Sequence, residues 1–459
     1  MSTYHRYHIE TSPAPDHVSH PSRFRVHVRR PRLLGLVLRE LIQFRGNLSV
    51  ALSRPCVYGV FGSPVGGLAP REQHCVGCLR CTVQYPDIVQ VEPNPDRRGI
   101  GDSYLTPDQV DTILYEARTG RVPVRGAGYR GPFGGEGWDG LWTDMSEIVR
   151  PTRDGIHGRE FISTLVDLGE KPSRLAFDGN GGPVGPEPRV VSISVPFLLD
   201  LPPRSVRSDG LLRALTEAAR RIDALAIVPA SYAERGLAGP HVVPLVGLAD
   251  RGRPLRLDGS PRLLMLDGWD AGRFEDLRRS FPGSLVGVRV PADADVLGLV
   301  RGGARIVHLT ADYHARVGDR FFGERILEVH RALVEAGLRE EVTLIGSGGI
   351  AAAEHVPKAM VCGLDAVGLD TAVCVALQAR FHGECRERET ARIALHGMDG
   401  GWAVQRVVNL AGSWRDQLLE VMGAMGLREA RRLRGETGRC MFQRDVEREA
   451  FAGIHGYDG

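Results

Sequence analysis

The stretch Val342-Thr343-Leu344-Ile345-Gly346-Ser347-Gly348-Gly349-Ile350 is an apolar, β-branched run that leads directly into a glycine-rich turn. A helical segment follows at residues 353–361, and a second apolar run, Ala366-Val367-Gly368-Leu369, ends at Asp370-Thr371. This order predicts two parallel strands joined by a helix. Glycines after a strand let backbone N–H groups approach phosphate oxygens. The two turns therefore predict a phosphate site; turns selected only for tight packing remain the alternative.

The same alternation extends through the chain before this stretch. Strands that are apolar along their full length and alternate with helices imply a parallel sheet buried on both faces. Eight such strands predict an α/β fold, a closed (β/α)8 TIM barrel, with functional loops at the carboxyl ends of the strands. The helix after the third strand is not evident. The expected strands are 190–197, 224–229, 241–246, 263–266, 285–290, 305–309, 342–345 and 366–369, and the expected helices are 211–221, 273–279, 323–336 and 353–361.

Length and composition indicate one large domain with additions. The chain has 459 residues, 42% of them hydrophobic, and a formal net charge of +2, which gives no reason to expect a nucleic-acid partner. The first twenty residues are polar, and the apolar run at 33–41 contains Arg39 and Glu40 and is too short to cross a membrane. We therefore expect a cytoplasmic protein without a membrane partner.

Four segments are expected from the pattern. An N-terminal segment (1–120) carries helices at 32–44 and 105–119, the second capped by Thr106 and ended by Gly120. A loop-rich connection (121–187) ends in a Pro- and Gly-rich linker at 178–188. The barrel occupies 188–400, and a C-terminal helical extension (401–459) opens with a long amphipathic helix at 402–426.

Three cysteines in the first segment have a distinctive spacing. His74-Cys75-Val76-Gly77-Cys78-Leu79-Arg80-Cys81 contains two C-x-x-C spacings that share Cys78, which is the arrangement of an iron–sulfur cluster. Tyr85-Pro86 stands where bacterial ferredoxins have Cys-Pro, so one cluster is expected, and Cys56 is the nearest candidate for the fourth ligand. A 4Fe-4S cluster is favoured over a 3Fe-4S cluster; three unrelated buried cysteines are the alternative. We interpret Cys362, Cys374, Cys385 and Cys440 as structural thiols.

Several motifs together resemble the FMN-binding glutamate synthase family. The resemblance covers most of the chain from about residue 120 and rests on 125–128 with 142–155, on Ser347-Gly348-Gly349-Ile350 with 363–368, and on 420–427. The barrel glycines alone would also suit IMP dehydrogenase and other flavin barrels. Gly126-Ala127-Gly128-Tyr129-Arg130-Gly131 matches G-x-G-x-x-G, but Pro132 follows where a helix should begin, so we interpret it as a loop.

The resemblance implies a barrel that binds FMN and reduces 2-iminoglutarate, formed from 2-oxoglutarate and ammonia, with electrons arriving through an iron–sulfur cluster. By position, Ser347, Gly348 and Gly349 would contact the FMN phosphate, as would Gly368, Asp370 and Thr371. Arg289 stands where the family has a lysine beside the flavin; an ordinary charged residue at a strand end is the alternative. His314, after strand six with His308 and Asp312, is a candidate acid or base, or else a hydrogen-bonded loop histidine.

The chain also departs from the family. The substrate loop after strand six reads Thr310-Ala311-Asp312-Tyr313-His314, the first strand reads Pro196-Phe197-Leu198-Leu199-Asp200, and Asp370 replaces a glycine. The glutaminase nucleophile and an NAD(P)H-binding domain are not evident. Electrons are therefore expected from a ferredoxin or a partner flavoprotein, and ammonia from solution or a separate subunit. A flavin enzyme for another imine or carbonyl substrate remains open, as does a catalytically diverged electron-transfer or assembly subunit.

Overall fold

The computed structural model describes residues 8–47, 56–123, 134–145, 162–174, 176–185, 188–250, 254–395 and 397–456. The chain divides into two compact units. The larger unit comprises the described residues within 1–16, 101–122 and 133–459, and the smaller comprises those within 17–100 and 123–132. The resemblance motifs at 125–128 and 146–155, and the G-x-G-x-x-G stretch, fall outside the described residues.

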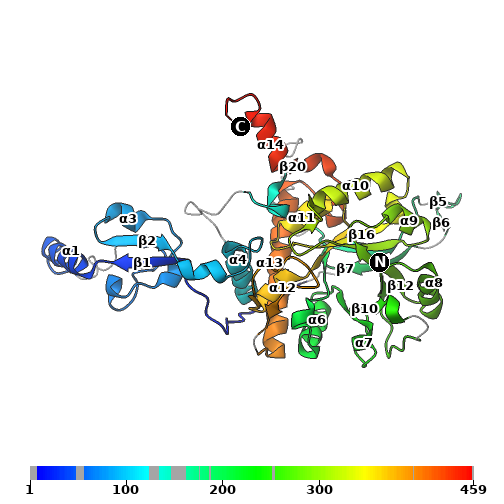
Figure 1. The fold of residues 1–459 in the computed structure, drawn as a ribbon, viewed down its shortest axis with the longest axis horizontal. Helices are drawn as coiled ribbons and strands as arrows, with labels where there is room; N and C mark the ends of the chain where they lie inside the picture. Colours follow the sequence, from blue (N-terminus) through cyan, green and yellow to red (C-terminus); the bar gives the residue numbers. More distant parts are fainter. Residues whose placement is uncertain are drawn as a thin grey trace. The chain divides into compact units, whose positions relative to one another are not determined.

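Eight parallel strands close into a barrel, as the sequence predicts (Figure 1). Each strand pairs in parallel with the next along the chain, and β17 closes the barrel against β8. The strands are short and almost fully buried because helices cover their outer faces. They are β8 (Phe197–Leu199), β9 (Ala226–Pro229), β10 (Val242–Gly247), β11 (Leu263–Asp267), β12 (Leu285–Pro291), β13 (Ile306–Thr310), β16 (Thr343–Ser347) and β17 (Ala366–Leu369).

Four of the seven helices around the barrel, α6, α8, α9 and α12, begin at a side-chain cap. Ser208 and Asp270 accept hydrogen bonds from backbone N–H groups in the first turns of α6 and α8, which satisfies donors that a helix leaves unpaired. Among the described residues between the third and fourth strands, a 3-10 turn, Leu248–Asp250, stands in place of a helix. The helices of the barrel are α6 (Asp209–Arg221), α7 (Ala230–Ala233), α8 (Ala271–Ser280), α9 (Val296–Arg301), α10 (Phe322–Glu335), α11 (His355–Cys362) and α12 (Thr371–Ala376).

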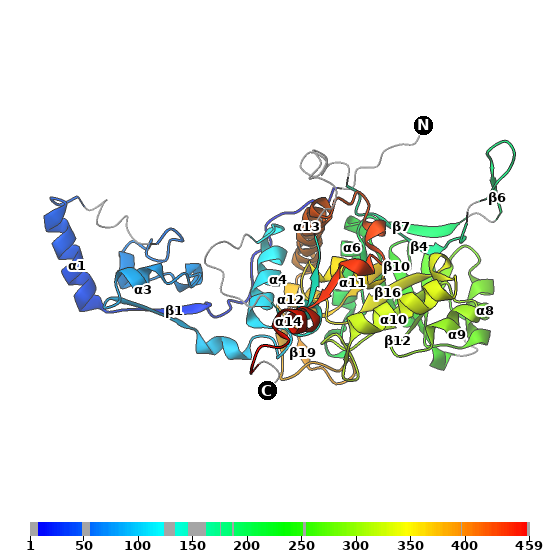
Figure 2. The ribbon, with the colours of Figure 1, turned by 90° about the horizontal axis from the view of Figure 1, so that it is seen from above.

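One predicted strand is wrong in its extent. The apolar run 190–197 is divided by a bend at Ser194–Pro196, and only its end enters the barrel. Its first part, β7 (Arg189–Ile193), pairs antiparallel with β4 (Val166–Glu170), and Figure 2 shows these two strands side by side. Thr343, the first residue of β16, exchanges hydrogen bonds with the backbone of Gly169 in β4. The β4–β7 pair therefore lies at the amino ends of the barrel strands, which leaves the carboxyl ends for function.

Two long helices support the barrel from the terminal segments. α4 (Pro107–Thr119) begins with the predicted cap, in which the side chains of Thr106 and Gln109 each accept a hydrogen bond from the other residue's backbone N–H. α13 (Gly400–Ala424) packs against both α4 and α6 (Figure 1). The amphipathic helix expected at 402–426 is confirmed, and α13 buries Val404, Val407, Val408, Leu418 and Met422, whereas Leu419 and Val421 are only half-buried. Trp414 extends the buried face, and its indole donates to Glu116 of α4.

The remaining elements of the larger unit are short. A small hairpin joins β5 (Ala176–Phe177), just before the stretch expected as a linker, to β6 (Pro183–Val184) within it. β20 (Cys440–Phe442) pairs antiparallel with β3 (Leu141–Thr143) and leads into α14 (Gln443–Phe451). Two further pairs join β14 (Arg316–Val317) to β15 (Arg320–Phe321) and β18 (Arg380–Phe381) to β19 (Ile393–Ala394). In the described part of the chain, no helix has the length and apolar character needed to span a membrane.

The smaller unit is built around one antiparallel pair. β1 (Phe24–Val28) pairs with β2 (Val89–Pro93), and the helices α1 (Arg30–Gln43) and α3 (Arg80–Gln84) complete it. The predicted helix at 32–44 is therefore confirmed, with bounds one or two residues earlier. The hydrophobic core of the smaller unit contains Val26, Val60, Cys75, Ile88 and Val89. The cysteine loop is thus part of the hydrophobic core of this unit.

Candidate functional site

The glycine turn after β16 is held by three hydrogen bonds to consecutive carbonyl groups. The carbonyl of Ser347 accepts from the backbone N–H of Ala311 at 2.8 Å, that of Gly348 from the indole of Trp138 at 3.0 Å, and that of Gly349 from the hydroxyl of Tyr104 at 2.7 Å. In a trans peptide the C=O and the following N–H point in opposite directions. The N–H groups of Gly348, Gly349 and Ile350 therefore point away from these donors.

Those three N–H groups are buried and make no hydrogen bond to any described residue. Buried backbone donors normally have an acceptor, so this row of donors fits an anionic ligand such as phosphate. Gly349 adopts φ +65°, and a Cβ placed there would lie 2.6 Å from the Cβ of Ala315 and 2.7 Å from the hydroxyl oxygen of Tyr104. Only glycine fits this position without displacing its neighbours.

The turn after β17 differs from this arrangement. Asp370 is the N-cap of α12, and its Oδ1 accepts the backbone N–H of Thr371 at 2.6 Å. Its other oxygen pairs with Arg388 at 2.8 Å, and both side chains are largely or fully buried. Burial raises the pKa of the Asp370 carboxyl group, and the charge of Arg388 opposes this change. The N–H of Thr371 is therefore occupied by a carboxylate of the chain itself. Gly368, at the end of the same strand, lies against Ser347, where a Cβ would overlap the hydroxyl group.

Arg289 and Asp200 form an ion pair inside the barrel. Arg289 Nη2 lies 3.2 Å from Asp200 Oδ2, and Arg388 approaches the same carboxylate at 3.6 Å. Burial would raise the pKa of Asp200, but the charges of Arg289 and Arg388 hold it well below its usual range. The Nε of Arg289 is buried and has no hydrogen-bond partner among the described residues. Arg289 thus neutralises Asp200 and keeps one donor for a ligand.

His308 of β13 is the neighbour of Arg289 in the strand register. It is fully buried, its Nε2 lies 2.7 Å from the hydroxyl oxygen of Ser347, and its Nδ1 has no partner in the described part of the chain. Burial lowers the pKa of His308 to about 3, so the ring is neutral. Arg289, His308 and Ser347 therefore lie on three consecutive strands at the carboxyl end of the barrel.

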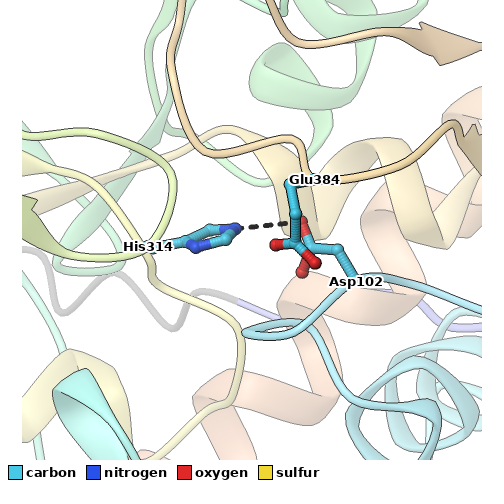
Figure 3. Close-up of side chains that lie close together, drawn as sticks. All are labelled: Asp102, His314 and Glu384. Carbon is cyan, nitrogen blue, oxygen red and sulfur yellow. Dashed lines mark hydrogen bonds and ion pairs between the residues drawn. The ribbon is translucent and has the colours of Figure 1, made fainter.

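His314 is held by groups outside the barrel strands (Figure 3). Its Nε2 lies 2.9 Å from Asp102 Oδ2, and its ring stacks on Tyr104, which also holds the glycine turn. Ligand atoms of Asp102, His314 and Glu384 lie within 4.8 Å of one another. Glu384 accepts hydrogen bonds from the backbone and hydroxyl of Ser103, so internal hydrogen bonds account for the cluster. The Nε2 of His314 is engaged by Asp102, and its role as acid or base stays a prediction.

The four cysteines of the smaller unit lie near one another. Positive φ angles at Gly77 and Leu79 curl the loop between Cys75 and α3. Burial raises the pKa of Cys75, the backbone of Gly77 opposes this by hydrogen bonding, and the nearby thiols of Cys81, Cys56 and Cys78 raise it further. Cys56 therefore lies close to the C-x-x-C loop, where the proposed fourth ligand should be.

The sulfurs of Cys56, Cys75, Cys78 and Cys81 are spaced more widely than the ligands of a single metal ion. Zinc binds each cysteine sulfur at about 2.3 Å, which brings the sulfurs within about 4 Å of one another. Within the described residues, the Asp102 cluster is the one group of three ligand atoms that lie within 4.8 Å of one another. A cubane cluster attaches each sulfur to a different iron, so its ligands stand farther apart. The cysteine geometry therefore fits a cluster better than one metal ion.

Sequence reasoning did not identify every residue that forms this site. Tyr104 and Trp138 precede the barrel in segments without periodic patterning, and Arg388 lies in an irregular loop, so no sequence signal marked them. Asp200 directly follows a buried barrel strand, a position at which polar residues gather in functional sites. That signal was present in the sequence, and it would have placed Asp200 in the site.

Comparison with known proteins finds similarity to glutamate synthases. Residues 324–428 match the model of a family described as the conserved region in glutamate synthase. Archaeal-type glutamate synthase (NADPH) of Dehalococcoides mccartyi is 25% identical over 436 residues, covering 80% of this chain and 86% of that protein. The corresponding protein of Thermotoga maritima is 22% identical over 491 residues, covering 89% and 93%.

A third relative has a higher sequence identity to this chain, but over a shorter aligned region. Archaeal glutamate synthase (NADPH) of Methanocaldococcus jannaschii is 37% identical over 121 residues, 25% of this chain and 24% of that protein. Among solved structures, a mutant flavocytochrome b2 with pyruvate bound has 11% identity and a TM-score of 0.41, over 65% of this chain and 76% of that chain. Residues 324–428 thus match the conserved region in glutamate synthase, and the chain is similar to archaeal-type glutamate synthases over most of its length.

Proposed function

We propose that this chain is a glutamate synthase-like oxidoreductase whose barrel holds FMN and reduces 2-iminoglutarate formed from 2-oxoglutarate and ammonia. The observation that carries the proposal is the row of unpaired N–H groups at Gly348, Gly349 and Ile350, in a barrel related to glutamate synthases. FMN, when bound, supplies hydride transfer. The protein contributes binding, orientation and electrostatics.

The residues present fit FMN at one phosphate turn and only partly at the other. Gly348, Gly349 and Ile350 would hold the phosphate, with Ser347 fixed beside them by His308. Thr371 would not contribute its N–H, because Asp370 already accepts it. Arg388 offsets the charge of Asp370 and so reduces its repulsion of a nearby phosphate. Arg289 directs positive charge into the barrel, where it would stabilise negative charge on a reduced ring system.

We propose that electrons enter through a 4Fe-4S cluster held by Cys56, Cys75, Cys78 and Cys81. The relatives are named for NADPH, whereas this sequence has no credible dinucleotide fingerprint. A ferredoxin or a separate flavoprotein would therefore pass electrons to the cluster, and ammonia would come from solution or from another subunit. This division of roles follows the segments expected from the sequence, 1–120 for the cluster and 188–400 for FMN.

The first test is a visible absorption spectrum, with iron and flavin analysis, of protein purified without oxygen. The proposal expects one FMN and about four irons per chain. Reduced protein should then turn over 2-oxoglutarate with ammonium, and related oxo acids serve as controls for the substrate. Iron without flavin, even after reconstitution with FMN, would overturn the enzyme assignment. It would instead favour an electron-transfer or assembly subunit. In such a subunit the carboxyl end of the barrel would hold its ion pairs and no flavin.

A further inference from the structure

Two cysteines that the proposed function does not use are in contact. The sulfurs of Cys362 and Cys440 lie 3.9 Å apart and share a hydrogen bond, although 78 residues separate them in sequence. Cys362 is the last residue of α11 and is fully buried, and Cys440 opens β20 and is partly exposed. No motif or spacing in the sequence pairs these two cysteines, which are expected as structural thiols.

The two thiols differ electrostatically. A hydrogen bond from Cys362 lowers the pKa of Cys440, burial opposes this change, and the charge of Arg331 adds to the lowering. The pKa of Cys362 is raised well above its usual range by the same hydrogen bond and by burial. Thiolates, and not thiols, attack disulfides. Cys440 is therefore suited to be the attacking sulfur and Cys362 the second, resolving sulfur.

A large cavity is lined in part by residues that closely follow Cys440 in sequence. It has a volume of about 960 Å³, and its lining includes Phe442 and Gln443, which follow Cys440 within three residues. The lining also carries six carboxylates, Glu136, Asp319, Glu324, Glu328, Asp445 and Glu447, so the cavity has no excess of positive charge. Among the described residues, Arg331 forms no ion pair, and its charge acts on Cys440. The arginines of the lining are Arg316, Arg320, Arg331, Arg444 and Arg448.

We propose that Cys362 and Cys440 are a redox-active pair that forms a reversible disulfide by exchange with a small-molecule disulfide such as oxidised glutathione. The Cys440 thiolate attacks one sulfur of that disulfide and releases one glutathione thiolate, which leaves a mixed disulfide on Cys440. The Cys362 thiol then loses its proton, attacks the Cys440 sulfur and releases the second glutathione. The protein loses two electrons and two protons, and the small disulfide gains them.

The bond would join two parts of the fold that now touch without a covalent link. It would fix β20, and through it β3, to the end of α11. α11 connects the glycine turn to β17, and its first residue, His355, accepts the N–H of Ala351 and bonds to Asp139. Oxidation would therefore tether the helix that joins the two phosphate turns. The inference does not depend on which cofactor the barrel binds.

The test uses the full chain, purified without oxygen and with its cofactors, equilibrated at several ratios of reduced to oxidised glutathione. After alkylation and digestion, mass spectrometry should find a peptide pair joined through Cys362 and Cys440, which dithiothreitol separates. Cys362→Ser should stop the reaction at a glutathione adduct on Cys440. Cys440→Ser should leave the buried Cys362 unmodified, and Cys374→Ser, which removes a different buried thiol, should leave the cross-link unchanged.

The charge of Arg331 offers a readout that a purely structural pair would not show. Arg331→Gln should slow cross-link formation several-fold at neutral pH, and Arg331→Lys should restore most of the rate. The inference is overturned if Cys362 and Cys440 both remain alkylated at every glutathione ratio. It is also overturned if wild-type protein accumulates the Cys440 adduct without the cross-link. Melting curves of each variant exclude misfolding as the cause.

Discussion

Asp200 and Arg289 form an ion pair across the interior of the barrel. Asp200 follows β8 and Arg289 lies in β12, and these strands are four places apart in a closed barrel of eight. Their side chains nevertheless meet at 3.2 Å, with Asp200 fully buried. The pair therefore links opposite walls of the barrel at its carboxyl end, below the turns proposed to hold FMN.

This pair should matter for stability because one partner alone would be a buried, uncompensated charge. Asp200→Asn should lower the free energy of unfolding by about 3 kcal/mol. Asp267→Asn is the matched control, since Asp267 approaches the same arginine at 3.8 Å but is 48% exposed, and it should change stability by less than about 1 kcal/mol. Chemical denaturation measures both. Equal effects would mean that Asp200 contributes no more than a surface charge.

The geometry of the glycine turn predicts a separate effect at Gly349. Gly349→Ala forces a Cβ against Ala315 and Tyr104 and should abolish flavin retention while the iron content stays unchanged. Gly337→Ala is the control, because Gly337 also has a positive φ, +69°, but open space around it. It should lose only about 1 kcal/mol of stability and keep its flavin. A Gly349→Ala protein with full flavin content would remove this turn from the cofactor site.

Asp370 should weaken phosphate binding, because its charge lies at the turn where the family has glycine. Asp370→Asn keeps the size of the side chain, removes the charge and frees Arg388 for the phosphate. We expect the Kd for FMN to fall up to about tenfold, equivalent to about 1.4 kcal/mol. Titration of the apoprotein with FMN, followed by flavin fluorescence, measures this. Glu387→Gln, which removes an exposed charge, is the control. A higher Kd for FMN in Asp370→Asn than in the wild type would show that the Asp370–Arg388 pair is itself required to shape the site.

The barrel could be predicted because each of its strands is apolar along its length and is followed by a recognisable turn or helix. The first strand was misjudged because β7 and β8 form one apolar run in sequence, and only the bend at Ser194–Pro196 separates them. The phosphate turn was predictable from its glycines. The residues that orient it were not, because Tyr104 and Trp138 reach it from segments more than 200 residues away in sequence. Likewise, nothing at Asp370 indicated that Arg388 would neutralise it.

His308 predicts a pH dependence of stability. Burial lowers its pKa to about 3 in the folded protein from 6.5 in the unfolded chain, so the unfolded state binds the proton more readily. Stability is therefore full above pH 6.5 and falls as the pH decreases below it, by about 1.4 kcal/mol per unit. His308→Gln should flatten this slope between about pH 6.5 and pH 5. Ser347→Ala should retain it, because burial and not the hydrogen bond to Ser347 is the main cause. An unchanged slope in His308→Gln would contradict the assignment of this pH dependence to His308.

The cysteine loop predicts that substituting different cysteines will have different effects on the iron content of the protein. Cys78→Ala should remove the cluster, and with it the broad visible absorbance and nearly all of the iron, because the central cysteine serves both C-x-x-C spacings. Cys56→Ala tests the fourth ligand and should yield a cluster that loses iron or is converted to a three-iron form. Cys374→Ala is the control, since Cys374 is buried in the larger unit, and its iron content should match the wild type. Full iron in Cys56→Ala would mean that a different group completes the cluster. Full iron in Cys78→Ala would refute the cluster assignment, because the other described cysteines of the smaller unit, Cys56, Cys75 and Cys81, are already assigned as ligands.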